Sequence, residues 1–167
     1  ILIKSYMKAI DETITLTSEE ERVLHDYLFS VEIWGLYELS FFSSCSPLLS
    51  VQLLTKYTRE MLRKSDFLQG VGKNRNMMHT LLLNGFMACI EVDDFTNALY
   101  FKKQIEKNFF EENETYFRIV YLWAEGLLDS KQGRVEDGQR KMEDAVRIFE
   151  MIGCSKSADY YRSAIEC

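Results

Sequence analysis

The sequence has 167 residues, of which 47% are hydrophobic and 28% are charged. These proportions are typical of a soluble globular protein, so they exclude intrinsic disorder and low-complexity fibres. Its 20 basic and 26 acidic residues give a formal net charge of −6, which opposes binding of this chain itself to the phosphate backbone of DNA or RNA.

Residues that form turns are scarce, with eight glycines and one proline in the whole chain. A fold of many short strands needs more turns than these residues can supply, so the composition favours an all-α protein. No uninterrupted apolar stretch reaches about 18 residues, and we therefore expect no membrane span. The four cysteines form no CxxC pair and have no histidine in ligand register, so we expect free thiols in a reducing cytoplasm.

The first residues, 1–10, resemble the inside of an amphipathic helix. A capping box then follows at residues 17–20, where the Thr17 hydroxyl can accept the amide three residues on while Glu20 reaches back to the Thr17 amide. Apolar residues recur behind this box at helical spacing and predict a buried stripe. The stripe consists of Val23, Leu24, Tyr27, Leu28 and Val31.

A second helix start is predicted at Ser46-Pro47, because proline at the first helical position gives up an amide that would have no partner there. Gly70 and Gly72 are expected in a loop. A long helix is then predicted from about Asn74 to Val92.

The second half of the chain shows a regular alternation of helices and turns. Helix starts are predicted at Asp93-Asp94 and at Asn113 or Glu114, and helix ends at Gly133 and Gly153. A last helix is expected from Ser155 to Glu166. About nine helices result, joined by short turns as antiparallel hairpins, which is the organisation of helical repeats.

Residues 119–152 give the best evidence for one repeat. Small residues at Gly126 and Gly138 would let two helices approach closely, and Gly133 would supply the turn between them. Met142 would fill the space near Ala145. This spacing predicts a degenerate tetratricopeptide-like hairpin.

One segment carries a family resemblance. Tyr27-Leu28 is followed by Trp34-Gly35-Leu36-Tyr37-Glu38-Leu39 and Phe41, Asn84 lies in a later long helix, and the C-terminal half is repeat-like. Together these features resemble the C-terminal regulatory domain of the Rgg/GadR/MutR family of transcriptional regulators, over essentially the whole chain.

The resemblance implies a right-handed superhelix of helix hairpins that binds a short peptide pheromone on its concave face for quorum sensing. It also implies a homodimer and a helix-turn-helix domain that precedes this sequence. We therefore expect residues 1–167 to form a single sensor and dimerisation domain. DNA would be contacted only through the preceding domain.

Three predicted helical stretches would line the concave face with amide, aromatic and aliphatic side chains, a mixture suited to an extended peptide. Two arginines could attract a peptide carboxylate. The candidate peptide-binding residues are Trp34, Tyr37 and Phe41, then Arg75, Asn76, Thr80, Leu83, Asn84 and Met87, and finally Tyr116, Arg118, Val120, Trp123 and Leu127.

Each of these residues has an ordinary structural alternative. Aromatic residues at helical spacing, such as Trp34, Tyr37 and Phe41, usually belong to the core. Asn84 is surrounded by leucines and Phe86 in the sequence, so if buried it requires either a ligand or a structural hydrogen bond.

Nothing in the sequence predicts an enzyme, a metal site or a cofactor. The segment Gly70-Val71-Gly72-Lys73 lacks the first glycine and the hydroxyl residue of a phosphate-binding loop. His25 and His79 have no nucleophile or metal-ligand partner in register. The alternative to a peptide sensor is a helical-repeat adaptor that binds a folded protein and no small ligand.

Overall fold

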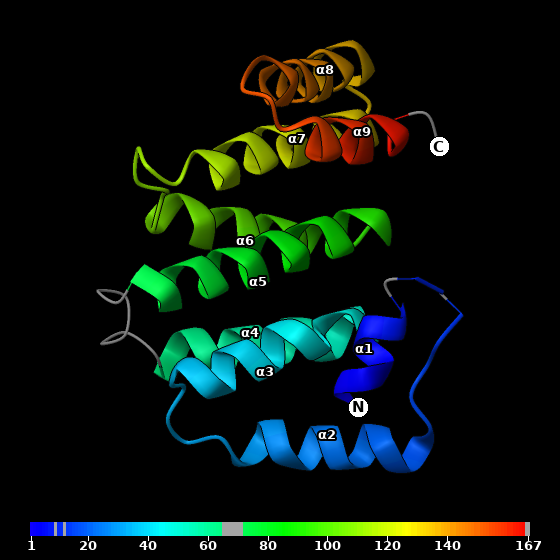
Figure 1. Ribbon diagram of the computed structural model, residues 1–167, viewed down its shortest axis with the longest axis vertical. Helices are drawn as coiled ribbons and strands as arrows, with labels where there is room; N and C mark the ends of the chain where they lie inside the picture. Colours follow the sequence, from blue (N-terminus) through cyan, green and yellow to red (C-terminus); the bar gives the residue numbers. More distant parts are fainter. Residues whose placement is uncertain (9, 12, 65–71, 166–167) are drawn as a thin grey trace. The chain divides into compact units, whose positions relative to one another are not determined.

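The computed structural model describes residues 1–8, 10–11, 13–64 and 72–165, and the side chains of residues 72–74 are not among the described features. The chain forms two compact units, Ile1–Gly85 and Phe86–Cys167. We refer to them as unit 1 and unit 2. Figure 1 shows the helices of both units in chain order.

The described residues form nine α-helices and one short 3₁₀ helix, with no strand among them. This confirms the prediction of an all-α helical-repeat fold. The α-helices are α1 (Leu2–Lys8), α2 (Ser18–Ser30), α3 (Leu36–Cys45), α4 (Val51–Lys64), α5 (Gly72–Glu91), α6 (Phe95–Lys107), α7 (Thr115–Lys131), α8 (Val135–Met151) and α9 (Ser155–Ser163), and the 3₁₀ helix η1 is Ser46–Leu48. Across the described ranges, no helix combines the length and apolar character needed to cross a bilayer.

The capping box at the start of α2 is confirmed. The Glu20 amide donates to the Thr17 hydroxyl at 3.3 Å, and the Thr17 amide donates to the Glu20 carboxylate at 2.7 Å. Leu24 and Leu28 are fully buried behind it. The predicted stripe was wrong for Val23, which is 52% exposed, because this position lies outside the 100°-wide face that α2 turns to the core.

One predicted helix start and one predicted loop residue need correction. Ser46-Pro47 opens only η1, and α4 begins at Val51, where the Ser50 hydroxyl accepts the Leu53 amide at 3.3 Å. Gly72 is the first residue of α5 and not part of a loop, whereas Gly70 lies outside the described residues. The observed boundaries differ from the predicted ones because a proline or glycine marks a break in the chain without fixing where the next helix begins.

The core of unit 1 is aromatic. Trp34 precedes α3 and packs on Phe42, with ring centroids 5.4 Å apart, and Phe42 in turn contacts Tyr57 of α4 at 6.3 Å. All three side chains are at most 1% exposed. The Tyr57 hydroxyl donates to the His25 carbonyl of α2 at 3.2 Å, so this core ties α2, α3 and α4 together.

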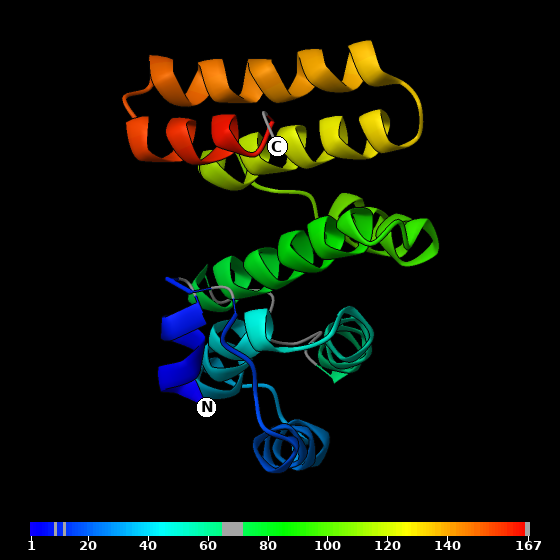
Figure 2. The ribbon, with the colours of Figure 1, turned by 90° about the vertical axis from the view of Figure 1, so that its right-hand side faces the viewer.

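In unit 2, α7 and α8 cross at two glycines, as predicted. A Cβ atom added to Gly126 would lie 2.6 Å from the Gly138 carbonyl oxygen, and one added to Gly138 would lie 2.4 Å from the Gly126 carbonyl oxygen. Any side chain at either position would therefore separate the two backbones. Figure 2 shows α8 lying along α7, with α9 beside both.

Three turns of unit 2 each contain a residue with a positive φ angle. Asp93, Gly133 and Gly153, which follow α5, α7 and α8, have φ values of 57°, 88° and 78°. After the first turn, Asp94 caps α6 by accepting the Asn97 amide at 3.2 Å. The predicted ends of helices at Gly133 and Gly153 and the predicted cap at Asp94 are confirmed.

Candidate functional site

The predicted residues of α5 form one stripe along the helix, which we call the α5 stripe. It contains Asn76, Thr80, Leu83, Asn84 and Met87, whose spacing of three or four residues places them on one face. Leu83 is 2% exposed, Asn76 is exposed, and the other three are half-buried. The stripe therefore combines an apolar base with accessible polar groups.

The side-chain amides of the α5 stripe are available for further hydrogen bonds. The Thr80 hydroxyl donates to the Asn76 carbonyl oxygen at 2.9 Å, inside the same helix. Within the described ranges, the side-chain amides of Asn76 and Asn84 make no hydrogen bond. A half-buried amide such as Asn84 can therefore donate to and accept from an external backbone.

The predicted residues of α7 also form one face, which we call the α7 stripe: Tyr116, Val120, Trp123 and Leu127. The middle of this face, at Val120 and Trp123, packs inside unit 2. Tyr116 contacts Phe149 of α8 with ring centroids 5.7 Å apart, and Trp123 contacts Tyr161 of α9 at 5.2 Å. Val120 and Trp123 are at most 5% exposed, whereas Leu127 is half-buried and Tyr116 is 50% exposed.

The aromatic cluster of Tyr116, Trp123, Phe149 and Tyr161 contains two buried polar groups, the indole N–H of Trp123 and the hydroxyl of Tyr161. The indole N–H of Trp123 is buried with no hydrogen-bond partner in the described part of the chain. Burial raises the pKa of Tyr161 far above its ordinary value, and the neighbouring Tyr116 raises it further. The Tyr161 hydroxyl therefore remains protonated at any physiological pH, and the cluster behaves as an apolar junction between α7, α8 and α9.

The two candidate arginines already have partners. Arg118 donates to the carbonyl oxygens of Phe110 and Glu111, and its guanidinium lies 5.0 Å from the ring centroid of Phe109. It thereby fastens the segment before α7 to that helix. Arg75 is half-buried near the start of α5 and also has an interaction partner.

The three aromatic candidates of unit 1 have different environments. Trp34 is fully buried in the core, and its indole N–H has no hydrogen-bond partner among the described residues. Phe41 is half-buried between Tyr27 and Tyr37, with centroid distances of 4.8 and 6.5 Å. Tyr37 is 68% exposed, so of the three it is the most accessible to an external molecule.

The structure also shows a polar network that sequence reasoning missed. Lys102 of α6 donates to the Tyr121 hydroxyl at 2.9 Å, to the Glu125 carboxylate, and to Glu106, one turn away on α6, at 2.9 Å. The Tyr121 hydroxyl donates to Glu106 at 3.2 Å. The two pairs at i,i+4 spacing, Lys102 with Glu106 and Tyr121 with Glu125, were the available signal.

Burial opposes the charge on Lys102, but the hydrogen bonds to Glu125, Tyr121 and Glu106 outweigh it and raise the pKa of this lysine. Burial also raises the pKa of Tyr121 to about 12, although the hydrogen bond from Lys102 partly opposes that shift. At neutral pH the network therefore contains a protonated lysine and a neutral tyrosine. It fixes α6 against α7 and offers no group poised for proton transfer.

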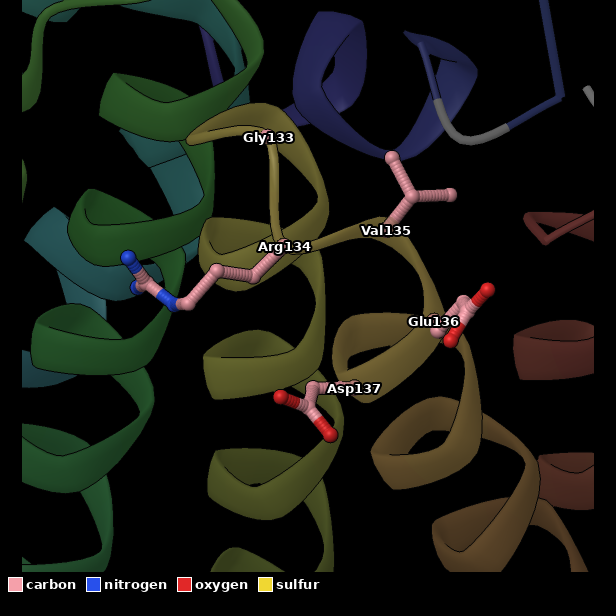
Figure 3. Close-up of a pocket in the computed structure, with 5 residues that line it drawn as sticks. All are labelled: Gly133, Arg134, Val135, Glu136 and Asp137. Carbon is pink, nitrogen blue, oxygen red and sulfur yellow. The ribbon is translucent and has the colours of Figure 1, made fainter.

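A surface depression of about 380 Å³ lies at the turn between α7 and α8, lined by residues 133–137. Figure 3 shows that the side chains of Arg134, Glu136 and Asp137 point in different directions. Arg134 is already paired with Asp129 at 2.5 Å. Side chains that diverge in this way do not form a ligand site, and none of the predicted peptide-binding residues lies here.

Consecutive helices that pack as hairpins, with α7 and α8 crossing at two glycines, define a helical-repeat domain. Residues 1–163 match the sequence model of the "HTH-type transcriptional regulator Rgg, C-terminal domain", and the chain belongs to this family. Because the family comprises transcriptional regulators, the prediction that the chain is not an enzyme is confirmed.

Solved structures agree with this assignment. The chain is 29% identical to the SHP pheromone receptor Rgg2 of Streptococcus dysgalactiae, with a TM-score of 0.84. The matched region covers 99% of this chain and 63% of the Rgg2 chain. The Rgg2(C45S) structure gives the same identity and TM-score, with 60% of that chain covered. A candidate transcriptional regulator from Listeria monocytogenes EGD-e, 21% identical, shares the fold with a TM-score of 0.79 over 90% of this chain and 52% of that one. The chain thus spans less than two thirds of each of these proteins.

Proposed function

We propose that this chain is the sensor domain of a quorum-sensing transcriptional regulator and that it binds a short peptide pheromone along the α5 stripe. The observation that carries the proposal is the likeness to Rgg2, a receptor for SHP pheromones, over 99% of this chain. In this proposal the regulator is a cytoplasmic homodimer. It contacts DNA only through a helix-turn-helix domain elsewhere in the polypeptide.

The chemistry of the α5 stripe supports peptide binding. Asn76 and Asn84 lie two turns apart on the stripe, and both amides are available for hydrogen bonds to an extended peptide backbone. Met87 is flexible and half-buried, so it can adapt to apolar side chains of different shape. Thr80 adds a hydroxyl between the two amides.

The remaining predicted residues support the site in different ways. Tyr37 and Phe41 offer accessible aromatic surface in unit 1, and Arg75 is a candidate partner for a carboxylate. Trp34, Leu83, Val120 and Trp123 are buried, so we assign them to the framework that holds the accessible residues. Tyr116, Arg118 and Leu127 remain candidates for peptide contact on α7.

Peptide binding would act on DNA-bound output by a shift in population. A ligand changes an equilibrium only by its difference in affinity for two states, so the peptide must bind one arrangement of the dimer more tightly than another. The proposed regulator would report this difference through its DNA-binding domains.

Isothermal titration calorimetry with a synthetic SHP pheromone tests the proposal, with a scrambled peptide of equal composition as the reference. We expect saturable binding of the pheromone, and a loss of about tenfold in affinity for Asn84→Ala, equivalent to about 1.4 kcal/mol. Asn113→Ala is the matched control, because Asn113 is exposed in the turn before α7. Its affinity should equal that of the unaltered chain.

Two outcomes would contradict the proposal. No heat from the pheromone or from other short hydrophobic peptides would remove the peptide ligand, and stable capture of a folded protein in the same assays would favour the adaptor function. Equal weakening by Asn84→Ala and Asn113→Ala would remove the α5 stripe as the binding site.

A further inference from the structure

Helix α1 is amphipathic in the reverse of the usual sense. Its polar residues are turned toward the protein: Ser5 is buried and donates to the Ser44 carbonyl oxygen of α3, and Lys4 forms an ion pair with Glu20 at 2.5 Å. Lys8, one turn after Lys4, donates to the Ile14 carbonyl oxygen at 2.9 Å. Both lysines of the helix are thus engaged by residues of unit 1.

The opposite side of α1 is apolar and exposed. Large hydrophobic side chains continue along this side into the residues that follow the helix. They are Leu2 (40% exposed), Ile3 (75%), Tyr6 (66%), Met7 (46%) and Ile10 (91%). A surface helix of a globular protein ordinarily places its charges in water and its apolar stripe in the core, so this arrangement indicates that another element covers the apolar side.

Figures 1 and 2 show α1 at the margin of unit 1, alongside α3. It packs against α3 and η1, which lie on its polar side. Its apolar side faces away from those two elements and is therefore accessible to a further segment of chain.

We propose that Leu2, Ile3, Tyr6, Met7 and Ile10 form the docking surface for an amphipathic helix that lies N-terminal to α1 in the same polypeptide. The Rgg2 chain extends well beyond the 63% that this chain covers, and the matched family domain is described as C-terminal, so relatives carry additional sequence that can supply such a helix. The two helices would form an antiparallel hairpin.

The organisation of unit 2 favours this occupant over a second copy of the chain. There, α7 packs on α8 and α8 packs on α9, so each helix is paired with its neighbour in sequence. A neighbouring helix is also tethered, which gives it a high effective concentration at the surface. Because the five residues of the docking surface carry no charge, we expect the docking helix to present leucine, isoleucine or aromatic residues to them.

Thiol labelling of the full-length polypeptide tests this inference without a variant that disrupts folding. Ile3→Cys is compared with Ile33→Cys, because Ile33 is 67% exposed in the same unit, and the labelled sites are read by mass spectrometry. We expect Ile3→Cys to react with a maleimide at least about tenfold more slowly than Ile33→Cys, as protection by a packed helix requires. Equal reaction rates would overturn the proposal.

A second experiment identifies the occupant. In the full-length polypeptide, Ile3→Glu combined with Tyr6→Glu should increase amide hydrogen exchange at least about tenfold in the segment just before Leu2, whereas Val23→Glu combined with Ile33→Glu should leave that segment unchanged. Protection of Ile3→Cys that disappears on dilution, together with loss of a dimer, would assign the surface to a second copy and overturn the proposal. Because neither measurement uses a peptide, failure here is distinguishable from failure of pheromone binding.

Discussion

The α5 and α7 stripes were predicted for the same role from the same spacing of residues, yet the structure covers them differently. In the α7 stripe, Trp123 is 5% exposed and packs on Tyr161 of α9, whereas Tyr116, which contacts Phe149 of α8, is 50% exposed. The α5 stripe leaves Asn76 exposed and Asn84 half-buried, with both amides without hydrogen bonds in the described ranges. Helical spacing therefore identifies which residues share a face, while the tertiary partners decide whether that face is core or surface.

This difference predicts opposite behaviour on mutation. Substitutions of the buried residues of the α7 stripe, Val120 and Trp123, should change stability more than ligand affinity. Those in the α5 stripe should change affinity more than stability. The following experiments measure stability for variants of the α7 stripe and its support, and both stability and affinity for a variant of the α5 stripe.

The largest effect is expected for Trp123→Ala. It removes a side chain that is 5% exposed and packed on Tyr161, so it leaves a cavity at the junction of α7 and α9. We expect the free energy of unfolding to fall by about 4 kcal/mol, measured by urea denaturation. Trp123→Phe, which keeps an aromatic ring and removes the buried N–H, should lose less than half as much.

A loss below about 1 kcal/mol for Trp123→Ala would place the indole outside the core. If pheromone affinity then fell more than tenfold, Trp123 would belong with the ligand-binding residues. The two stripes would no longer differ in kind.

The second largest effect is expected for Gly138→Ala, which acts on the support of the α7 stripe. The new Cβ would lie 2.2 Å from the Ser130 hydroxyl and 2.4 Å from the Gly126 carbonyl oxygen, so α8 must move away from α7. We expect a loss of about 3 kcal/mol in the free energy of unfolding, measured by urea denaturation.

Gly133→Ala is the matched control for this crossing. Gly133 has a φ of 88° and no atom within 4 Å of an added Cβ, so its substitution costs only the left-handed conformation, about 1 kcal/mol. Equal losses in the free energy of unfolding for Gly138→Ala and Gly133→Ala would mean that α7 and α8 can move apart without cost.

The sequence predicted those parts of the fold that depend on local chemistry. The capping box of Thr17 and Glu20 requires only residues three apart, and Gly133 requires only a left-handed turn. The close approach of Gly126 and Gly138 is a tertiary feature, but it left a local trace because only glycine fits there. The start of α4 was missed because Ser50 and the proline of η1 offer competing signals within four residues.

The candidate site was predictable to a smaller extent. Periodicity grouped the residues of each stripe correctly, because that grouping depends on 3.6 residues per turn alone. Whether Trp123 meets Tyr161 or a ligand depends on α9, more than 30 residues later in the sequence, and no local pattern encodes that contact. The network around Lys102 was missed for the same reason, since it joins two helices through long side chains.

A smaller loss of stability, which depends on pH, is expected for substitution of Asp129 near the end of α7. It accepts hydrogen bonds from Arg134 at 2.5 Å and from Lys141 of α8 at 2.7 Å. Burial alone would raise the pKa of this carboxyl group, but the bonds from Lys141 and Arg134 outweigh burial and hold the pKa below its ordinary value of 3.8. The stabilisation is therefore present above about pH 4 and is lost as the pH falls through the lowered pKa.

Asp129→Asn should lower the free energy of unfolding by about 1.5 kcal/mol at pH 7, since it removes a charge-assisted link between α7 and α8. Urea denaturation at several pH values would check this loss. The difference between the variant and the unaltered chain should shrink below pH 4. A difference that stays constant between pH 7 and pH 3 would show that the carboxylate charge makes no contribution there.

The smallest effect on stability is expected for Thr80→Val in the α5 stripe. The substitution conserves shape and removes only a hydroxyl that donates to the Asn76 carbonyl oxygen in the same helix, so the free energy of unfolding should change by less than about 0.5 kcal/mol. If the hydroxyl turns to the peptide on binding, pheromone affinity should fall about fivefold, equivalent to about 1 kcal/mol. Calorimetry and urea denaturation of the same sample measure the two quantities. A loss of stability without a loss of affinity would contradict the assignment of Thr80 to the peptide-binding residues. Thr80 would then belong to the framework, as Trp123 does. The accessible part of the α5 stripe would consist of its two amides and Met87.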